Sequence, residues 1–145
     1  MIYETMLQIR EYQTADRVAV IRLWKDVFPD APGLVLAPTP ERILAPESRF
    51  PKDCIFIAEQ DNEIVGAMMA GYDGMRGWLY LVGVAPASRR QGVGRRLMEA
   101  AEEKLRSLGC VKVNLQVRAG NNGVVGFYER LGYSIEERVS MGKRF

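Results

Sequence analysis

The chain has 145 residues and a formal net charge of +2, with 48% hydrophobic and 26% charged residues. This is the composition of a globular protein with one hydrophobic core, and no stretch approaches the roughly 20 consecutive apolar residues that a membrane span needs. Residues 1–145 are therefore predicted to form a single domain that has no membrane as a partner.

Histidine is absent from the chain, and its two cysteines, Cys54 and Cys110, are far apart in the sequence. Neither a disulfide framework nor a Cys/His zinc site is expected, so we predict two core cysteines and no metal site. The N-terminus shows no basic region followed by an apolar run, which predicts a cytoplasmic protein.

Charge is unevenly distributed along the sequence. Residues 1–88 contain 8 Lys and Arg against 12 Asp and Glu, whereas residues 89–145 contain 12 against 6. A basic second half suits a polyanionic ligand, and an acidic first half suits a cationic amine, although an ordinary solvated surface explains the acidic half equally well. Nucleic acid is not an expected partner, because the sequence has neither a basic tail nor a stacking platform.

The first third of the chain predicts a strand, a helix and a long excursion. Residues 1–5 are interpreted as a short N-terminal extension, followed by a strand around Leu7 and Ile9. Apolar residues from Val18 to Val27 have helical spacing. Six of the seven prolines lie from Pro29 to Pro51, which indicates a loop, with one short helix predicted at residues 41–44.

The remaining elements alternate between strands and helices. Short polar connections separate three apolar runs that predict antiparallel strands, at residues 54–59, 64–72 and 78–84. Downstream we predict a helix ending at Gly109, a strand at residues 111–118, a helix at about 121–131 and final strands within 134–143. The fold class is therefore α/β, a mixed sheet with helices packed on its faces.

Residues 84–95 join a predicted strand to a predicted helix. The first turn of a helix presents free N–H groups and partial positive charge, and a phosphate binds well there. Gly92 and Gly94 lack side chains that would keep an anion away from these amides. Three arginines add positive charge, namely Arg89, Arg90 and Arg95. The segment therefore predicts a pyrophosphate site.

Spacing excludes two other phosphate-binding loops. A P-loop requires Gly, four residues and then Gly-Lys-Ser/Thr, and no predicted strand is followed by such a run. The dinucleotide-binding fingerprint requires a third Gly or Ala at the position of Leu97. Taken alone, the remaining pattern Arg89-x-x-Gly92-x-Gly94 also fits an ordinary surface turn.

A second motif follows the strand predicted at residues 111–118. It reads Asn121-Asn122-Gly123-Val124-Val125-Gly126-Phe127-Tyr128-Glu129-Arg130-Leu131-Gly132-Tyr133. The two motifs, in this order and at about this distance, resemble those of the GNAT N-acetyltransferase superfamily, in which the second motif is Asn-x-x-Ala-x-x-Phe-Tyr-x-x-x-Gly-Phe. Val124 replaces the usual Ala. Together with residues 71–74, the loop is similar to the YpeA-like bacterial branch.

The resemblance implies a fold and an activity. The implied fold is one N-acetyltransferase domain with a mostly antiparallel sheet of six to seven strands and about four helices. The implied reaction transfers an acetyl group from acetyl-CoA, the co-substrate, to a primary amine of a small molecule or protein by direct attack. A non-catalytic acyl-CoA-binding regulatory module of the same fold stays open as an alternative, and so does a homodimer.

The same resemblance assigns roles to individual residues. The backbone of Val82 and Val84 pairs with the pantetheine arm, and Asn121 also bonds the pantetheine region. A bulge in this strand fits Gly83, although a glycine there could equally serve packing. Tyr128 protonates the leaving thiolate. The loop around the pyrophosphate comprises Arg89, Arg90, Gln91, Gly92, Val93, Gly94 and Arg95.

The general base and the acceptor are not determined by the sequence. The strand at residues 78–84 has no carboxylate, which leaves Tyr80, Asp73 and Glu59 as candidates acting through a water, or an amine that arrives neutral and needs no base. Polyamines, aminoglycosides, amino acids and protein amines all stay open as acceptors, and so does a longer acyl donor.

Overall fold

The computed structural model describes residues 6–29, 39–118 and 120–145. The extension predicted at residues 1–5 and part of the predicted proline-rich loop, residues 30–38, lie outside the described residues. The chain divides into two units, Met1–Leu115 and Gln116–Phe145.

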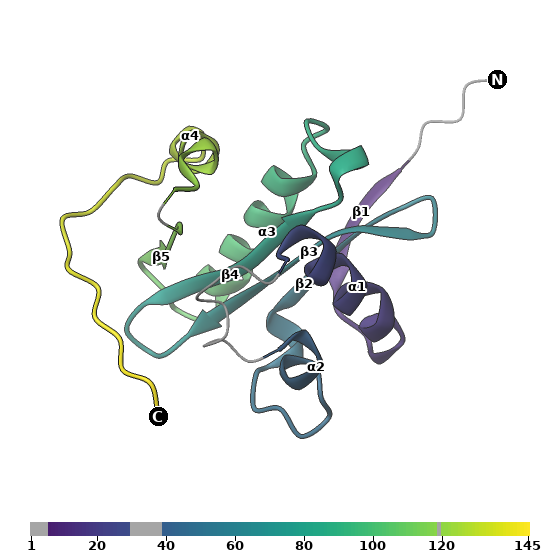
Figure 1. Cartoon of the computed structure of the whole chain (residues 1–145), viewed down its shortest axis with the longest axis horizontal. Coiled ribbons are helices and arrows are strands. Elements are labelled where there is room, and N and C mark those ends of the chain that lie inside the picture. Colours follow the sequence, from purple (N-terminus) through teal and green to yellow (C-terminus); the bar gives the residue numbers. More distant parts are fainter. Residues whose placement is uncertain (1–5, 30–38, 119) are drawn as a thin grey trace. The chain divides into compact units, whose positions relative to one another are not determined.

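The first unit is built on one sheet with the strand order β1-β2-β3-β4-β5 (Figure 1). Neighbouring strands from β1 to β4 are antiparallel, and β5 is parallel to β4. The strands are β1 (Leu7–Glu11), β2 (Ile55–Gln60), β3 (Glu63–Tyr72), β4 (Gly77–Val84) and β5 (Val113–Leu115). The mixed α/β sheet predicted from the sequence is therefore confirmed.

The helices follow the predicted apolar spacing closely. They are α1 (Arg17–Val27), α2 (Pro40–Ile43) and α3 (Val93–Ser107) in the first unit and α4 (Val125–Arg130) in the second. The short helix predicted in the proline-rich segment is confirmed as α2, where the Thr39 side chain accepts a hydrogen bond from the Arg42 N–H at 3.3 Å. Among the described residues, no helix combines the length and apolar character needed to cross a membrane.

Helices α1 and α3 pack on opposite faces of the sheet, because alternate residues of a strand point to opposite sides. Ala67 belongs to the core cluster that contains Val20 and Trp24 of α1. Its neighbour Gly66 faces α3, where an added Cβ would lie 2.9 Å from Cδ1 of Leu97. The central strand β3 is therefore covered on both faces, and α3 lies close enough to require glycine.

An ion-pair network that the sequence analysis missed joins β1 to the turn before α1. The Arg10 guanidinium donates to both carboxylate oxygens of Asp16, each at 2.8 Å, and to Oε2 of Glu59 at 2.6 Å. Asp16 also accepts the Gln13 N–H at 2.8 Å, and it is 6% exposed. The hydrogen bond from Arg10 holds the pKa of Asp16 below its usual range.

Asp16→Asn is expected to lower the free energy of unfolding at pH 7 by about 1.5–3 kcal/mol, the range of a charge-assisted hydrogen bond. Because the folded-state pKa of Asp16 is lowered, this contribution is complete above the unfolded-state pKa of about 4 and is lost as the pH falls through the folded-state value. Urea denaturation at pH 7 and at pH 3 measures it. Asp26→Asn, at an exposed position of α1, should change stability little at either pH.

The expected number of strands is not matched, since the sheet has five strands rather than six to seven. The strand predicted at residues 111–118 is paired only over Val113–Leu115, and residues 134–143 contain no strand. In that segment Ile135 is 79% and Val139 89% exposed. Alternating apolar residues favour an extended chain, but a strand forms only where a sheet edge pairs with it.

Candidate functional site

The bulge expected in the strand before the loop is present, but it lies earlier than predicted. Strand β4 pairs with β3 in two registers, Ala67 opposite Gly83 and Met69 opposite Tyr80. Two residues of β4, Leu81 and Val82, therefore face the single residue Met68, which defines a β-bulge. The bulge is thus at Leu81–Val82 and not at Gly83.

Glycine at position 83 has a packing role instead. A Cβ at Gly83 would lie 3.2 Å from Cε2 of Phe28 and 3.5 Å from Cγ1 of Val27, so the glycine allows α1 to approach the strand closely. Leu81 takes the left-handed conformation that a G1 bulge assigns to glycine, with φ of +52°. Such a backbone costs a leucine roughly 1–2 kcal/mol.

Just before the bulge, β4 separates from β5. The parallel pairing between these strands runs only from Gly77 opposite Val113 to Leu79 opposite Leu115. From Tyr80 to Val84, no described residue of β5 pairs with β4. The backbone at Val82 and Val84 thus borders an open strand edge.

The loop from β4 to α3 reverses direction through two residues in the left-handed conformation. A 3-10 turn at Pro86–Ser88 follows the strand, and then φ is +64° at Arg90 and +81° at Gly92. A Cβ added at Gly92 would meet no atom within 4 Å. Glycine therefore supplies the required backbone conformation here and leaves the adjacent space open.

The N-terminus of α3 presents backbone donors beside this glycine. The first intrahelical hydrogen bond runs from the Arg96 N–H to the Gly92 carbonyl at 3.1 Å, so the N–H groups of Val93, Gly94 and Arg95 precede it. No side chain of the described residues caps the helix. The Val93 side chain is buried, which leaves its backbone as the part that an anion can contact.

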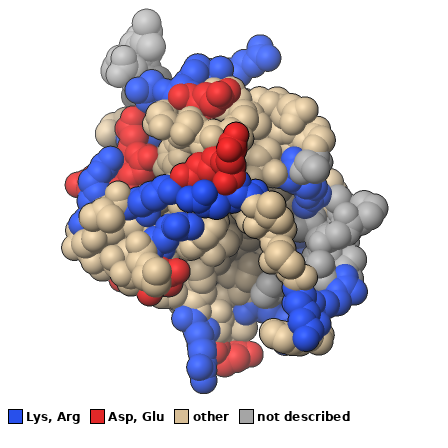
Figure 2. All heavy atoms as spheres, turned by 90° about the vertical axis from the view of Figure 1, so that its left-hand side faces the viewer, with Lys and Arg blue, Asp and Glu red and all other residues tan. Residues whose placement is uncertain are grey.

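Arg89 and Arg95 make hydrogen bonds within the loop and along α3. Arg89 donates from Nε to the Val84 carbonyl at 3.3 Å. Arg95 donates to Glu99 at 3.1 Å, one turn along α3. On the face drawn in Figure 2, basic and acidic side chains lie among one another, so charge of a single sign does not cover that face.

The second unit contains the other two predicted site residues, Asn121 and Tyr128. Asn121 is exposed and immediately precedes a 3-10 turn at Asn122–Val124, which leads into α4. The Tyr128 ring lies edge-on to Phe127 and Tyr133, with ring centroids 5.0 and 6.1 Å away. Burial raises the pKa of the Tyr128 phenol, so the group keeps its proton at neutral pH.

The three candidate bases are each disfavoured by their surroundings. The Glu59 carboxylate is engaged by Arg10. Asp73 accepts two backbone N–H groups at 2.8 Å, which lower its pKa. Burial, together with the charge of Asp73, raises the pKa of Tyr80, so its phenol stays protonated near neutral pH. None of the three is therefore well suited to act as a general base.

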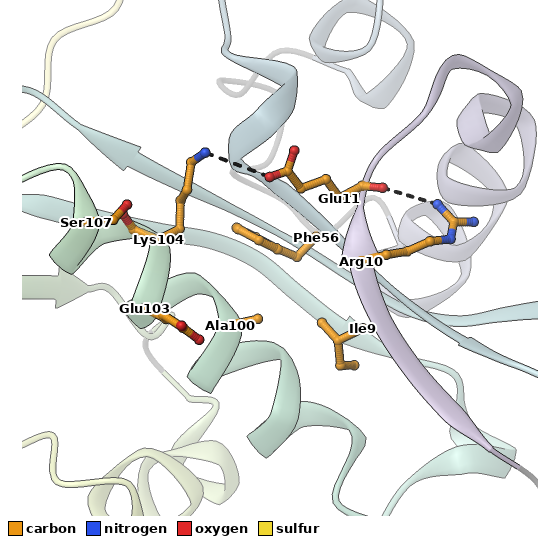
Figure 3. Close-up of a pocket in the computed structure, with 8 residues that line it drawn as sticks. All are labelled: Ile9, Arg10, Glu11, Phe56, Ala100, Glu103, Lys104 and Ser107. Carbon is orange, nitrogen blue, oxygen red and sulfur yellow. Dashed lines mark hydrogen bonds and ion pairs between the residues drawn. The ribbon is translucent and has the colours of Figure 1, made fainter.

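A groove of about 360 Å³ lies between β1 and α3, away from the loop (Figure 3). Two of its lining residues form an ion pair, with Nζ of Lys104 3.8 Å from Oε2 of Glu11. The groove is lined by Ile9, Arg10, Glu11, Phe56, Ala100, Glu103, Lys104 and Ser107. It contains none of the predicted site residues and is therefore not the pyrophosphate site.

Comparison with known proteins identifies the family. The model of the acetyltransferase (GNAT) family matches residues 18–133, which include the strand end, the loop and both sequence motifs. The chain belongs to the GNAT family. As a member of that family, it is an acetyl-CoA-dependent N-acetyltransferase, with acetyl-CoA as its co-substrate.

Relatives of this GNAT protein extend over almost its full length. An acetyltransferase of Pectobacterium atrosepticum is 37% identical over 140 residues, which cover 95% of both chains. An aminoglycoside N-acetyltransferase in complex with CoA has a TM-score of 0.78 at 21% identity and covers 99% of this chain and 98% of its own. The ribosomal-protein-S18-alanine N-acetyltransferase of Escherichia coli has a TM-score of 0.71 at 23% identity, covering 88% and 77%. These two structures show that the GNAT fold is shared.

Proposed function

We propose that this protein transfers the acetyl group of acetyl-CoA to a primary amine of a small molecule or protein by direct attack. The observation that carries the proposal is the juxtaposition of three features in one connection. These are the open strand edge of β4, the left-handed Gly92 with free space beside it, and the N–H groups that begin α3.

These features fit two polar parts of CoA, the pyrophosphate and the amides of the pantetheine arm. The N–H groups of Val93, Gly94 and Arg95 and the positive end of the α3 dipole would hold the pyrophosphate. Positive charge from Arg89 and Arg90, which are both exposed, would add to this attraction. Gln91 belongs to the same exposed loop, and its side chain donates to the Ala87 carbonyl at 3.5 Å.

The pantetheine arm carries amides, and amides pair with an open strand edge as an added strand would. The backbone of Val82 and Val84 borders such an edge. We assign these two residues, together with Asn121 of the second unit, to the pantetheine arm. Acetyl-CoA supplies the activated thioester when it is bound.

Tyr128 is proposed to donate a proton to the departing thiolate. A phenol whose pKa lies above 10 is fully protonated at neutral pH, and a thiolate has a reference pKa of about 8.5. Donation is therefore uphill unless the hydrogen bond strengthens as charge develops on the sulfur. The phenol is partly buried, and this favours such a bond, because hydrogen bonds to charged groups strengthen as the local dielectric falls.

The acceptor amine is proposed to attack in its neutral form without a dedicated protein base. This follows from the engaged or protonated state of Glu59, Asp73 and Tyr80. Transfer through an acylated cysteine is disfavoured, because Cys54 and Cys110 are both buried and burial raises the pKa of the Cys54 thiol. These observations support direct attack as the proposed reaction.

The proposed acceptor is a primary amine, with no narrower class specified. One similar structure is an aminoglycoside acetyltransferase and another acts on a protein alanine, so the shared fold accommodates both kinds of acceptor. A regulatory module that binds acyl-CoA without turnover is the second candidate, favoured by the absence of any Asp or Glu in β4.

Calorimetry with acetyl-CoA, followed by assays of CoA release with a panel of amines, tests the proposal. We expect binding in the micromolar range and CoA release with at least one class of amine. Binding without release for any amine would favour the regulatory module. No binding in that range would contradict both candidates.

A further inference from the structure

We propose that Trp24 is a positioning residue for CoA, because its indole N–H fixes the backbone of the β4 bulge and thereby sets the strand edge that receives the pantetheine arm. The inference rests on the proposed function and extends it to helix α1. No role in cofactor binding would be expected for Trp24 from its place in the sequence, because it lies among the apolar residues of an amphipathic helix.

The hydrogen bond joins the helix to the bulge directly. Nε1 of Trp24 donates to the carbonyl oxygen of Leu81 at 3.0 Å. Trp24 is 1% exposed, so water does not compete for this donor. An indole N–H can only donate, and a buried one must find an acceptor. The acceptor it finds is the residue of the bulge that has the left-handed backbone.

The direction of this hydrogen bond shows how the bulge is held. Carbonyl groups of a regular strand lie near the plane of the sheet and bond neighbouring strands. Helix α1 packs on a face of the sheet, so a carbonyl that accepts from Trp24 is turned out of that plane. The indole therefore offsets the loss of a normal strand partner at Leu81 and stabilises its strained backbone.

The bulge in turn decides which backbone groups face the open edge. Without the extra residue, the register between Met69 and Tyr80 would continue to the end of the strand. Residues 82–84 would then be displaced by one position, and their N–H and C=O groups would exchange between β3 and the open edge. Loss of the bulge would therefore misplace the groups assigned to the pantetheine arm and leave the loop sequence unchanged.

Packing around Gly83 supports the same role. A Cβ at this position would lie 3.6 Å from Cδ1 of Trp24 and 3.2 Å from Cε2 of Phe28. The glycine lets α1 come close to the strand directly after the bulge, and this places the indole within reach of the Leu81 carbonyl. Trp24 of α1 and Gly83 of β4 thus meet at the same short segment of β4.

Trp24→Phe separates positioning from packing, because it removes the N–H and keeps an aromatic ring. The readouts are the dissociation constants of CoA and of 3′-phosphoadenosine 5′-diphosphate, which has the pyrophosphate but no pantetheine arm. We expect the Kd of CoA to rise about 10-fold, as for the loss of one hydrogen bond of roughly 1.4 kcal/mol. The Kd of the nucleotide should be unchanged.

Val20→Ala is the matched control, because Val20 is fully buried on the same helix and its aliphatic side chain cannot donate a hydrogen bond to the bulge. It should lower stability without changing the ratio of the Kd of CoA to the Kd of the nucleotide. Equal loss of both ligands in Trp24→Phe, or no loss of either, would overturn the positioning role. Failure of the wild-type protein to bind CoA would overturn the proposed function itself.

A second measurement needs no variant and covers the case in which Trp24→Phe does not fold. Hydrogen exchange of the Trp24 indole proton is followed by NMR in the wild-type protein. We expect this proton to be protected in the free protein and at least about 10-fold more protected with CoA, but not with 3′-phosphoadenosine 5′-diphosphate. Equal protection with both ligands would contradict the positioning role.

Discussion

Gly92→Glu is expected to abolish acetyl-CoA binding, raising the Kd by more than about 100-fold, because a carboxylate at this position would compete with the pyrophosphate for the same donors. The space beside Gly92 is open, so the new side chain can enter it. Juxtaposed like charges at a binding interface cost several kcal/mol, and about 2.7 kcal/mol already corresponds to 100-fold. Calorimetry with acetyl-CoA measures the change.

The control for this substitution is Gly74→Glu in the turn between β3 and β4. Gly74 has φ of +91° and, like Gly92, has open space at its Cβ, so both variants carry the same charge and a similar backbone cost. We expect Gly74→Glu to bind acetyl-CoA with wild-type affinity. If both variants lost binding equally, the loop would have no special role. Gly92→Ala separates backbone strain from charge and should weaken binding far less than the glutamate.

The loop and its helix could be predicted from the sequence because their signals are local. Glycine at position 92 and the helical spacing that follows define where α3 begins, and Gly109, with φ of +91°, follows its end. The same holds for α2, whose Thr39 cap and Pro40 stand next to each other in the sequence. Elements whose start and end depend on neighbouring residues were thus placed within a few positions.

The bulge and the ion-pair network could not be placed, because they depend on residues far apart in the chain. Leu81 has a left-handed backbone that leucine alone would not favour, and the donor that stabilises it lies 57 positions away on α1. Arg10 and Glu59 are likewise separated by 49 positions. The sequence left Gly83 open between a bulge and a packing role, and the structure shows that this glycine accommodates a helix.

The prediction of final strands within residues 134–143 was wrong for a different physical reason. Residues 134–143 have the alternation of a strand, but pairing requires an edge, and the strand state is not an intrinsic property of the segment. In the described structure the segment is exposed, with a side-chain hydrogen bond from Gln116 to Ser140 at 3.1 Å. The alternation of apolar residues is therefore compatible with an extended chain, but it does not show whether a neighbouring strand is available to pair with it.

Tyr128→Phe is expected to lower kcat about 10- to 1000-fold while leaving the Kd of acetyl-CoA within about 2-fold, since the hydroxyl acts on the leaving thiolate and not on the pyrophosphate. Phenylalanine keeps the edge-on packing against Phe127 and Tyr133. Steady-state kinetics combined with calorimetry separates the two quantities. Near-normal kcat would show that the ring serves packing alone.

Tyr133→Phe is the matched control, because it removes a phenol hydroxyl from the same aromatic cluster. It should leave kcat close to the wild-type value. The pH dependence gives a further criterion: burial raises the pKa of Tyr128 above 10, so the phenol can donate at every pH below that value and loses this ability as the pH rises through it. The ratio of wild-type to Tyr128→Phe kcat should therefore be constant from pH 7 to 9 and decline only above pH 10. A ratio that already falls between pH 7 and 9 would assign the proton to another group.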